Sequence, residues 1–330
     1  MFDVITIGSV SRDVFFLTSE GKVIDDSVVP GKKLLAFEYG SKIIPENSLF
    51  TYGGAGANSA ISFSLLGAKV ATILNIGKEG TGSLVLEDLK NAGVNCRFVT
   101  RDKKNHTALS IIVDVPGEDH VMFLHRGTND YLKIKDWKSI KTKWFYLSSL
   151  TGESADLLPK IFSFKKEKNI KLAWNPGSEQ LAKGYAGLKE YLALTDVLLL
   201  NKNEAIKLVL SKDEDANIDD EKLLLGILFE MTGNIIVITN GGEGSYATDG
   251  KNDYYEPIKK TEVLETTGAG DAFGSTFVTG RVNGFDIQYC MKIASYNSAN
   301  VIRFIGAQAG LMTSRKLSDT IKTEEKKLAP

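Results

Sequence analysis

Residues 265–277, ETTGAGDAFGSTF, place three residues with little or no side chain directly before a carboxylate and an apolar run of helical period. A helix N-terminus carries unpaired N–H groups and a partial positive charge, and Gly268, Ala269 and Gly270 leave that backbone open to a phosphate. Asp271 would repel the phosphate, so it suits removal of a proton from an attacking hydroxyl better than it suits affinity. The alternative is that Asp271 only complements the helix dipole. The stretch therefore predicts an anion cradle with a candidate general base beside it.

Polar residues also follow the first predicted strand and open the first predicted helix. The sequence GSVSRD delivers Asp13 just past the strand, where a turn or helix-capping aspartate is the plainer alternative. In YGGAGANSA, residues 52–60, Gly53 and Gly54 let a ligand approach the backbone, and Asn58 offers both a donor and an acceptor in the first helical turn. A tight turn before a helix would also explain the glycines.

Two further loops follow buried strands later in the chain. In NKNEA, residues 201–205, Asn201 and Glu204 are three apart and share one face of the opening helical turn. An amide oxygen and a carboxylate so placed suit a water-rich Mg²⁺ shell, although a plain helix start has the same pattern. The TNGGEGSY loop at 239–246 is richer in glycine than structure alone demands, and a hairpin turn is its alternative. The chain has no G-x-x-x-x-G-K-[ST] sequence, which excludes a P-loop as the phosphate site.

The secondary structure that positions these loops is indicated by short apolar runs that alternate with helical patterns. Strands are expected at 4–9, 70–77, 144–149, 170–176, 197–201 and 235–239. Helices are expected at 56–67, 80–92, 152–169, 202–210 and 219–232. Strands that are apolar on nearly every residue are buried on both faces, so the alternation predicts a parallel sheet with helices on either side. Ligands bind beyond the carboxyl ends of such strands, where the loops lie.

Two segments break this rhythm. Residues 14–52 hold no convincing helix, and residues 96–130 include TALSIIVD and HVMFLH joined by PGED, a hairpin signal. Both segments are expected to form one small sheet inserted into the larger domain. The chain then divides into a large domain of residues 1–13, 53–95 and 131–330 and a lid of residues 14–52 and 96–130.

Composition and charge narrow the functional classes. The chain has 330 residues, of which 43% are hydrophobic and 25% charged, and 40 basic against 41 acidic residues give a net charge of -1. This balance provides no electrostatic case for nucleic acid or a membrane surface as partner. Two cysteines are too few for a disulfide framework, the first residues read as a strand, and apolar runs such as 192–200 fall short of the ~20 residues of a membrane span. We expect a soluble, cytoplasmic protein.

The early GGAGANSA and the late ETTGAGDAF together resemble the two signature motifs of the ribokinase-like carbohydrate kinases, also called the phosphofructokinase B type. Nearly the whole chain shares the order of family features: an aspartate after the first strand, a glycine-rich loop, N-x-x-E, T-x-G-x-x-G, G-A-G-D and a late G-A-Q. The resemblance implies a ribokinase-like three-layer α/β/α sandwich with a mostly parallel sheet and a small β-sheet lid. It also implies an ATP-dependent kinase that transfers the γ-phosphoryl group to a hydroxyl of a small sugar.

The resemblance assigns roles to individual residues around the acceptor. Asp271 would be the base that activates the accepting hydroxyl. Gly268, Ala269 and Gly270 would form the anion hole for the moving phosphoryl group. The sugar hydroxyls would be held by Asp13, Gly53, Gly54 and Asn58.

The resemblance implies a nucleotide and metal site in the same way. Asn201 and Glu204 would arrange Mg²⁺ and the phosphates through water. The nucleotide site would be lined by Thr239, Gly241 and Gly244, with Asn297 or Asn300 near the adenine. Many members carry an aspartate, part of a monovalent-cation site, where this chain has Glu265. The extra methylene can move or abolish that site, so activation by K⁺ is left open.

The sequence leaves the acceptor open among several classes. A neutral sugar is the first choice, whereas a sugar phosphate would call for basic side chains at the lid, for which the candidates are Arg12, Arg97, Arg101 and Arg126. A nucleoside would be favoured if aromatic side chains stacked on its base instead of filling the lid's own core; these are Phe15, Phe16, Phe50 and Tyr52. A dehydrogenase is disfavoured because no G-x-G-x-x-G follows the first strand, and a non-catalytic sugar sensor because G-A-G-D is complete. Exposed strand edges of the lid suggest a homodimer in which two lids pair.

Overall fold

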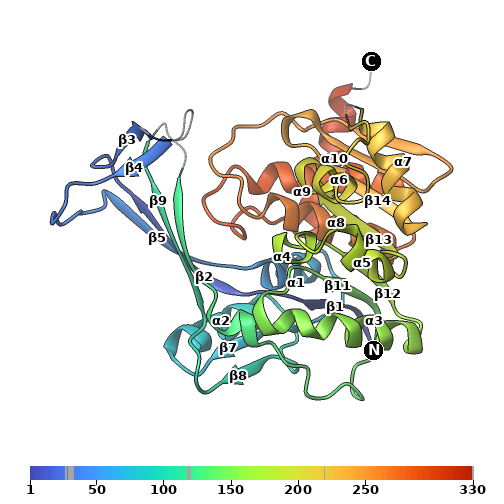
Figure 1. Ribbon diagram of the computed structural model, residues 1–330, viewed down its shortest axis with the longest axis horizontal. Coiled ribbons are helices and arrows are strands. Elements are labelled where there is room, and N and C mark those ends of the chain that lie inside the picture. Colours follow the sequence, from blue (N-terminus) through green and yellow to red (C-terminus); the bar gives the residue numbers. More distant parts are fainter. Residues whose placement is uncertain (27, 29–32, 117–119, 219, 329–330) are drawn as a thin grey trace.

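A mostly parallel eight-stranded sheet forms the centre of the computed structural model, which describes residues 1–26, 28, 33–116, 120–218 and 220–328 (Figure 1). The strand order is β16-β15-β14-β13-β12-β11-β1-β6. The parallel strands are β1 (Phe2–Ile7), β6 (Val70–Ile73), β11 (Thr142–Leu147), β12 (Lys171–Trp174), β13 (Val197–Asn201) and β14 (Ile235–Thr239). The antiparallel strands β15 (Ser245–Thr248) and β16 (Asp253–Glu256) complete one edge.

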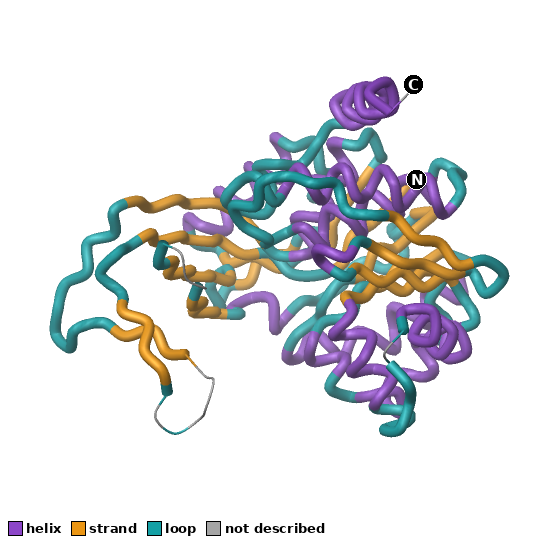
Figure 2. The backbone as a smooth tube through the Cα atoms, turned by 90° about the horizontal axis from the view of Figure 1, so that it is seen from above, coloured by secondary structure: helices purple, strands orange, loops and turns teal. Residues whose placement is uncertain are grey.

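Helices cover both faces of this sheet, because the apolar side chains of each strand alternate between two cores (Figure 2). In β1, Ile5 and Ile7 belong to one core and Val4 to the other. The first core packs against α3 (Leu158–Lys168), α5 (Gly184–Leu192), α6 (Lys202–Leu210) and α7 (Glu221–Thr232). The second packs against α1 (Ala55–Leu65), α2 (Gly80–Asn91), α8 (Ala269–Val282) and α9 (Ile287–Val301), and α10 (Ser314–Leu328) packs on α9. The expected three-layer α/β/α sandwich is confirmed.

Two expected elements are divided in the structure, and several others differ by one or two residues at their ends. The expected strand 70–77 splits into β6 and β7 (Asn75–Gly77), and β7 leaves the large sheet to pair with β8 (Thr100–Asp102). The expected helix 152–169 begins as a 3-10 turn, Gly152–Leu157, before α3 starts. Within the described part of the chain, no helix combines the length and apolar character needed to cross a membrane.

A second, four-stranded sheet projects from the body and forms the lid (Figures 1 and 2). Its strands, in the order β10-β9-β2-β5, are β10 (Val121–His125), β9 (Ala108–Asp114), β2 (Ser11–Leu17) and β5 (Asn47–Gly53). Beyond them, β3 (Lys22–Asp25) and β4 (Lys33–Ala36) form a separate two-stranded sheet. Because β2 begins at Ser11, Asp13 lies in the lid itself, not in a loop that ends the first strand of the large sheet.

Two expected features fall partly outside the described residues. Strands β9 and β10 are antiparallel, as the hairpin signal indicated, but residues 117–119 of the connecting turn are not described. The helix expected from 219 is α7, and residue 219 itself is also outside the described part.

Helices α1 and α8 approach each other closely because small residues face one another. The hydroxyls of Ser275 in α8 and Ser62 in α1 are hydrogen-bonded at 2.7 Å. Gly274 leaves room beneath α8 for the buried Tyr146 side chain, because a Cβ added to this glycine would lie 2.3 Å from Tyr146 Oη. The N-terminal half of α8 is thereby held against both α1 and β11.

We expect Gly274→Ala to destabilise the fold, because overpacking a tight core costs about 1–3 kcal/mol. Gly226 in α7 provides a matched control, since a Cβ added there meets nothing within 4 Å. Gly226→Ala should be neutral or should stabilise by up to about 1 kcal/mol, because alanine favours the helix. Urea unfolding of both variants measures the free energy of unfolding, and equal effects at the two positions would contradict the tight contact with Tyr146.

Candidate active site

A cavity of about 360 Å³ lies between the lid and the body of the protein, and we call it the lid cavity. The alternation of side chains along the lid strands turns one set toward it: Ser11, Asp13, Phe15, Ser110, Ile112, Met122 and Leu124. The body contributes residues from the starts of two helices, including Gly54, Asn58 and Asp271. The cavity thus combines two carboxylates with an apolar wall.

Asp13 presents a buried carboxylate to the lid cavity. Only 6% of the residue is exposed, and Ser11 Oγ donates a hydrogen bond to Asp13 Oδ1 at 2.7 Å. Burial raises the pKa of Asp13, while hydrogen bonds from Ser11 and Ser110 oppose that shift. Position 53 requires glycine, because a Cβ added to Gly53 would lie 1.9 Å from Asp13 Oδ2. The structure therefore brings Asp13 and the glycine-rich loop together, as the sequence suggested.

Asp271 lies in the first turn of α8 and faces the same cavity. Asn58 Nδ2 donates to Asp271 Oδ2 at 2.8 Å, and Gln308 Nε2 donates to Asn58 Oδ1 at 2.9 Å. Burial raises the pKa of Asp271 to about 6, and the hydrogen bond from Asn58 partly opposes the shift. A carboxylate with a pKa in this range can accept a proton near neutral pH, as a general base must.

The turn before this carboxylate has an exposed backbone. Gly268 has φ 81, a backbone conformation that residues with a side chain rarely adopt. A Cβ added to Gly268 would also lie 2.5 Å from Ala307 Cβ. A Cβ added to Gly270 would point into open space, with nothing within 4 Å. The Ala269 N–H donates to the Thr266 carbonyl at 3.2 Å, so the remaining N–H groups of the first turn are the candidate anion donors.

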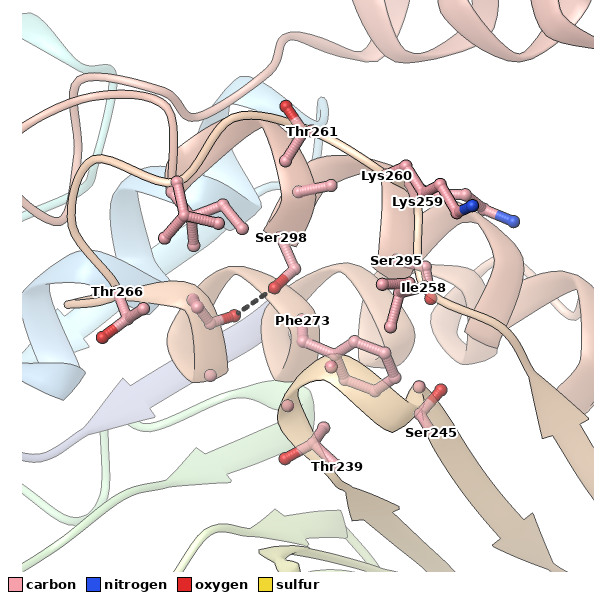
Figure 3. Close-up of a pocket in the computed structure, with 18 residues that line it drawn as sticks. Thr239, Ser245, Ile258, Lys259, Lys260, Thr261, Thr266, Phe273, Ser295 and Ser298 are labelled. Atoms are coloured by element: carbon pink, nitrogen blue, oxygen red, sulfur yellow. Dashed lines mark hydrogen bonds between the residues drawn. The ribbon is translucent and has the colours of Figure 1, made fainter.

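A second cavity of about 430 Å³, the loop cavity, lies beside the same turn (Figure 3). The β14–β15 connection is a hairpin, and it also forms a wall of this cavity with Thr239, Gly241, Gly244 and Ser245. Phe273 projects from α8, and the segment 258–263 covers the opposite side. Ser298 Oγ donates to the Ala269 carbonyl at 3.0 Å, shown dashed in Figure 3, and this bond ties α9 to the turn.

One face of α9 and its C-cap borders the loop cavity with Ser295, Ser298, Ala299 and Ile302. Asn297 and Asn300, which we expected near the nucleotide, do not border it. Asn297 is fully buried, donates to Thr276 Oγ1 at 2.8 Å and accepts from Met312 N at 2.9 Å. Asn300 donates to the Gly310 carbonyl. The structure therefore corrects this expectation, because both amides bind within the core.

A small cavity of about 100 Å³ lies where β13 and β14 end, next to Gly270. Asn201 and Glu204 border it, and they also cap α6: each backbone N–H donates to the other's side-chain oxygen at 2.9 Å. Burial raises the pKa of Glu204. Asn175 borders the same cavity and donates to the Leu199 carbonyl at 2.9 Å. Asn175 is not among the site residues predicted from the sequence, although its place directly after β12 was the available signal.

Glu265 fixes the loop that leads into α8. Its Oε1 accepts from Thr267 N at 2.6 Å, and its Oε2 accepts from Gly306 N at 3.3 Å. Both carboxylate oxygens thus hold the backbone of neighbouring loops. Among the residues that the structure describes, no three His, Cys, Asp or Glu side chains gather in a way that could hold a metal ion.

Of the four arginines considered for a phosphate group on the acceptor, Arg126 borders the lid cavity. Its guanidinium pairs with Glu179, which also accepts from Gly152 N at 3.0 Å. The other three have different neighbours: Arg12 stacks on Phe50 and Tyr52, Arg97 stacks on Phe98, and Arg101 donates to Ser83 Oγ. The positive charge of Arg126 is therefore balanced by a carboxylate.

A β-sheet lid covers a cavity with two carboxylates, and a second cavity borders the same glycine-rich helix N-terminus, on a framework of the ribokinase fold. The chain belongs to the pfkB family of carbohydrate kinases, whose model matches residues 21–314. It is thus a phosphotransferase with an alcohol group as acceptor, and the family and enzyme class expected from the sequence are confirmed.

Individual relatives agree with this assignment. An uncharacterized sugar kinase of Archaeoglobus fulgidus is 28% identical over 259 residues, which cover 77% of this chain and 99% of that protein. The nucleoside kinase of Methanocaldococcus jannaschii has a TM-score of 0.78 at 21% identity, covering 98% of this chain and 99% of that one. Arabidopsis thaliana ribokinase, complexed with ribose and ATP, has a TM-score of 0.80 at 17% identity, covering 97% and 99%. At these identities the two solved structures show the shared fold.

Asp271 should make the stability of the protein depend on pH. Its pKa of about 6 in the folded chain exceeds the ordinary value of 3.8, so the folded state binds this proton more tightly than the unfolded state. The resulting stabilisation is present below about pH 4 and is lost as the pH rises through about 6. Relative to Asp271→Asn, the wild type should lose up to about 3 kcal/mol between pH 4 and pH 7. Denaturant unfolding at both pH values measures this; a difference independent of pH would contradict the raised pKa.

Proposed function

We propose that this protein is an ATP-dependent kinase that transfers the γ-phosphoryl group to a hydroxyl of a small neutral sugar. The observation that carries the proposal is the position of the α8 N-terminus between two cavities. Gly270 borders the loop cavity, and Asp271 borders the lid cavity. A nucleotide in the first cavity and an acceptor in the second would therefore meet at one helical turn.

The proposed chemistry divides between backbone and side chains. First-turn N–H groups and the dipole of α8 favour the charge on the moving phosphoryl group. Asp271 takes the proton from the attacking hydroxyl, and Asp13 accepts hydrogen bonds from other hydroxyls of the acceptor, which selects the hydroxyl that reaches Asp271. Because phosphoryl transfer has a loose transition state, positioning and charge stabilisation supply most of the catalysis.

Mg²⁺ fits the small cavity beside Gly270, because Asn175, Asn201 and Glu204 bring amide and carboxylate oxygens there, which suit binding through water. When bound, the ion neutralises charge on the phosphates of the nucleotide. A monovalent cation at Glu265 stays a prediction: each of its carboxylate oxygens accepts a backbone N–H and keeps a second lone pair.

A neutral acceptor is favoured over a phosphorylated one by the charge at the lid cavity. A phosphate needs a cation that can turn toward it, and bidentate pairing with arginine is the usual solution. Arg126 is the arginine of the four candidates that borders the cavity, and Glu179 already pairs with it. A phosphate group would have to compete with that carboxylate.

A nucleoside is the second candidate, and the apolar wall of the lid cavity favours it. Phe15, Ile112 and Met122 form part of this wall, which could cover a planar base. Of the four aromatic side chains that we considered for this role, Phe15 is the one that borders the cavity. A kinase assay over pentoses, hexoses, sugar acids, phosphosugars and nucleosides, corrected for nucleotide hydrolysis, tests both candidates; turnover confined to phosphosugars would overturn the neutral-acceptor proposal.

We also propose that two lids pair in a homodimer. Along β10, Met122 and Leu124 face the cavity, so Val121 and Phe123 point to the outer side of the lid, where they are 37% and 62% exposed. Phe50 of β5 is also 56% exposed. Sedimentation at micromolar concentration should show twice the mass of one chain, and Phe123→Lys should shift the protein toward the monomer. A wild-type monomer at that concentration would contradict the pairing.

Two substitutions should separate the binding of phosphate from the removal of the proton. Asp271→Asn should leave nucleotide affinity unchanged or slightly higher, because it removes a like charge, while turnover falls about 10² to 10⁴-fold. Gly270→Val should fold normally, since the added side chain enters open space, yet nucleotide binding and turnover should fail together because that space is the proposed phosphate site. Calorimetry measures nucleotide affinity, and ADP release measures turnover.

Gly80→Val supplies the control for the second substitution. Gly80 is the first residue of α2, just as Gly270 lies in the first turn of α8. A Cβ added to Gly80 also meets nothing within 4 Å. This variant should bind nucleotide and turn over as the wild type does. If Asp271→Asn kept near-normal turnover, Asp271 would be a helix-dipole partner and the proposed mechanism would be wrong.

A further inference from the structure

Three side chains from distant parts of the chain form one line of hydrogen bonds that ends at the proposed base. Gln308 Nε2 donates to Asn58 Oδ1 at 2.9 Å, and Asn58 Nδ2 donates to Asp271 Oδ2 at 2.8 Å. Asn58 is 2% exposed, so its amide has little access to water as a substitute partner. The line crosses from the segment after α9 through α1 to α8.

The carboxylate of Asp271 fixes which group donates and which accepts in each of these hydrogen bonds. An ionised carboxylate only accepts hydrogen bonds, so Asn58 must turn its NH₂ group toward Asp271. Its oxygen then faces Gln308, which must offer a donor. If residue 308 offered only acceptors, the side-chain amide of Asn58 would be favoured to flip so that its NH₂ group faced residue 308. Its oxygen would then face the carboxylate of Asp271.

The segment that carries Gln308 is firmly held against the same helix turn. Ala307 is buried, and it is so close to Gly268 that a Cβ added to the glycine would lie 2.5 Å from the alanine Cβ. Gly306 has φ 92 and donates to Glu265 Oε2, and on its other side it lies against Thr51 of the lid strand β5. Gln308 is therefore fixed in relation to the N-terminus of α8, as a positioning group must be.

We propose that Gln308 is a positioning residue, which orients the Asn58 amide so that Asn58 donates to Asp271 and holds it as an ionised base. The proposal rests on the proposed function, in which Asp271 takes the proton from the acceptor. It also changes the role expected for Asn58. One N–H and the oxygen of its amide already form hydrogen bonds within the protein. Its main role is therefore to orient the base and not to bind a sugar hydroxyl.

Other ionisable groups around Asp271 are unchanged by substitution of Gln308. Tyr146 lies beneath α8 with its pKa raised by burial and by the nearby Asp271 charge. Asp13 and Arg126 border the same cavity, and Glu265 lies in the loop before the helix. A shift in the titration of Asp271 in Gln308→Met, which adds no charge, would thus report the Asn58 bond, whereas the charge added by Gln308→Glu contributes to its own shift.

Two substitutions with opposite chemistry test the proposal. Gln308→Glu keeps the shape of the side chain but, when ionised, offers only acceptors, so it should turn Asn58 over. Gln308→Met keeps a similar length and removes the donor without forcing a reversal. At pH 8 we expect kcat to fall about 30-fold or more for Glu and about 3- to 10-fold for Met, the scale of a hydrogen bond to a charged group. The KM for the nucleotide should change less than about twofold, because that site is untouched.

A titration without any substrate gives an independent readout. The carboxyl carbon of Asp271, followed by ¹³C NMR, should titrate at higher pH in both variants than in the wild type. The shift should be larger in Gln308→Glu, where Asn58 no longer donates to the ionised form, than in Gln308→Met, where Asn58 can still donate but is no longer held in that orientation. Arg303→Met is the matched control, because it alters an exposed side chain of the same segment, and it should leave kcat and the titration unchanged. Thermal unfolding of each variant identifies any loss that comes from misfolding.

The outcomes separate the two proposals. If Asp271→Asn abolishes turnover while both Gln308 variants keep the wild-type kcat and Asp271 titration, the positioning role is wrong and the proposed function stands. If Gln308→Met is as damaging as Gln308→Glu or more so, loss of packing explains the effect and the positioning role is also wrong. If Asp271→Asn keeps its turnover, the proposed function itself fails, whatever the titration shows.

Discussion

The close contact of α8 with β11 and with the segment after α9 is the constraint on which the site depends. It requires residues without side chains: a Cβ at Gly274 would strike Tyr146, and one at Gly268 would strike Ala307. Small residues make this contact, and the result is that the first turn of α8 borders two cavities at once. The G-A-G-D sequence is therefore a packing requirement as much as a chemical one, and the open backbone beside Gly270 is what remains for a ligand.

Burial of two carboxylates under the lid opposes the stability of the fold. Desolvation raises the pKa of both Asp13 and Asp271, and each is held by a few hydrogen bonds from neutral groups, with no cation as direct partner in those bonds. Neutral donors such as Ser11 and Asn58 keep the carboxylates oriented without lowering their pKa as far as an ion pair would. A carboxylate that retains affinity for a proton, as a general base would need, is the chemical consequence of this arrangement.

Most of the fold could be predicted from the sequence, because strands buried on both faces and glycine-rich loops at their ends are local signals. The same locality explains the errors. Asn297 and Asn300 lie on α9, but Ser295, Ser298 and Ala299 form its cavity face, and which face that is depends on packing. The contacts of Asn58 with Asp271 and with Gln308 join residues 213 and 250 positions apart, a separation at which a single sequence carries no spacing signal.

The two halves of the site differ in how far they depend on side chains. On the loop-cavity side, glycines and the first-turn N–H groups of α8 form the surface beside Gly270, while side chains such as Phe273 and Ile302 line the rest of the cavity. On the lid side, Asp13 and the apolar side chains of several lid strands line the cavity. The backbone half suits a phosphate, whose recognition needs N–H groups and a dipole. Under the proposed function, the side-chain half can vary in shape and polarity while the turn of α8 stays fixed, and the lid would set the identity of the acceptor.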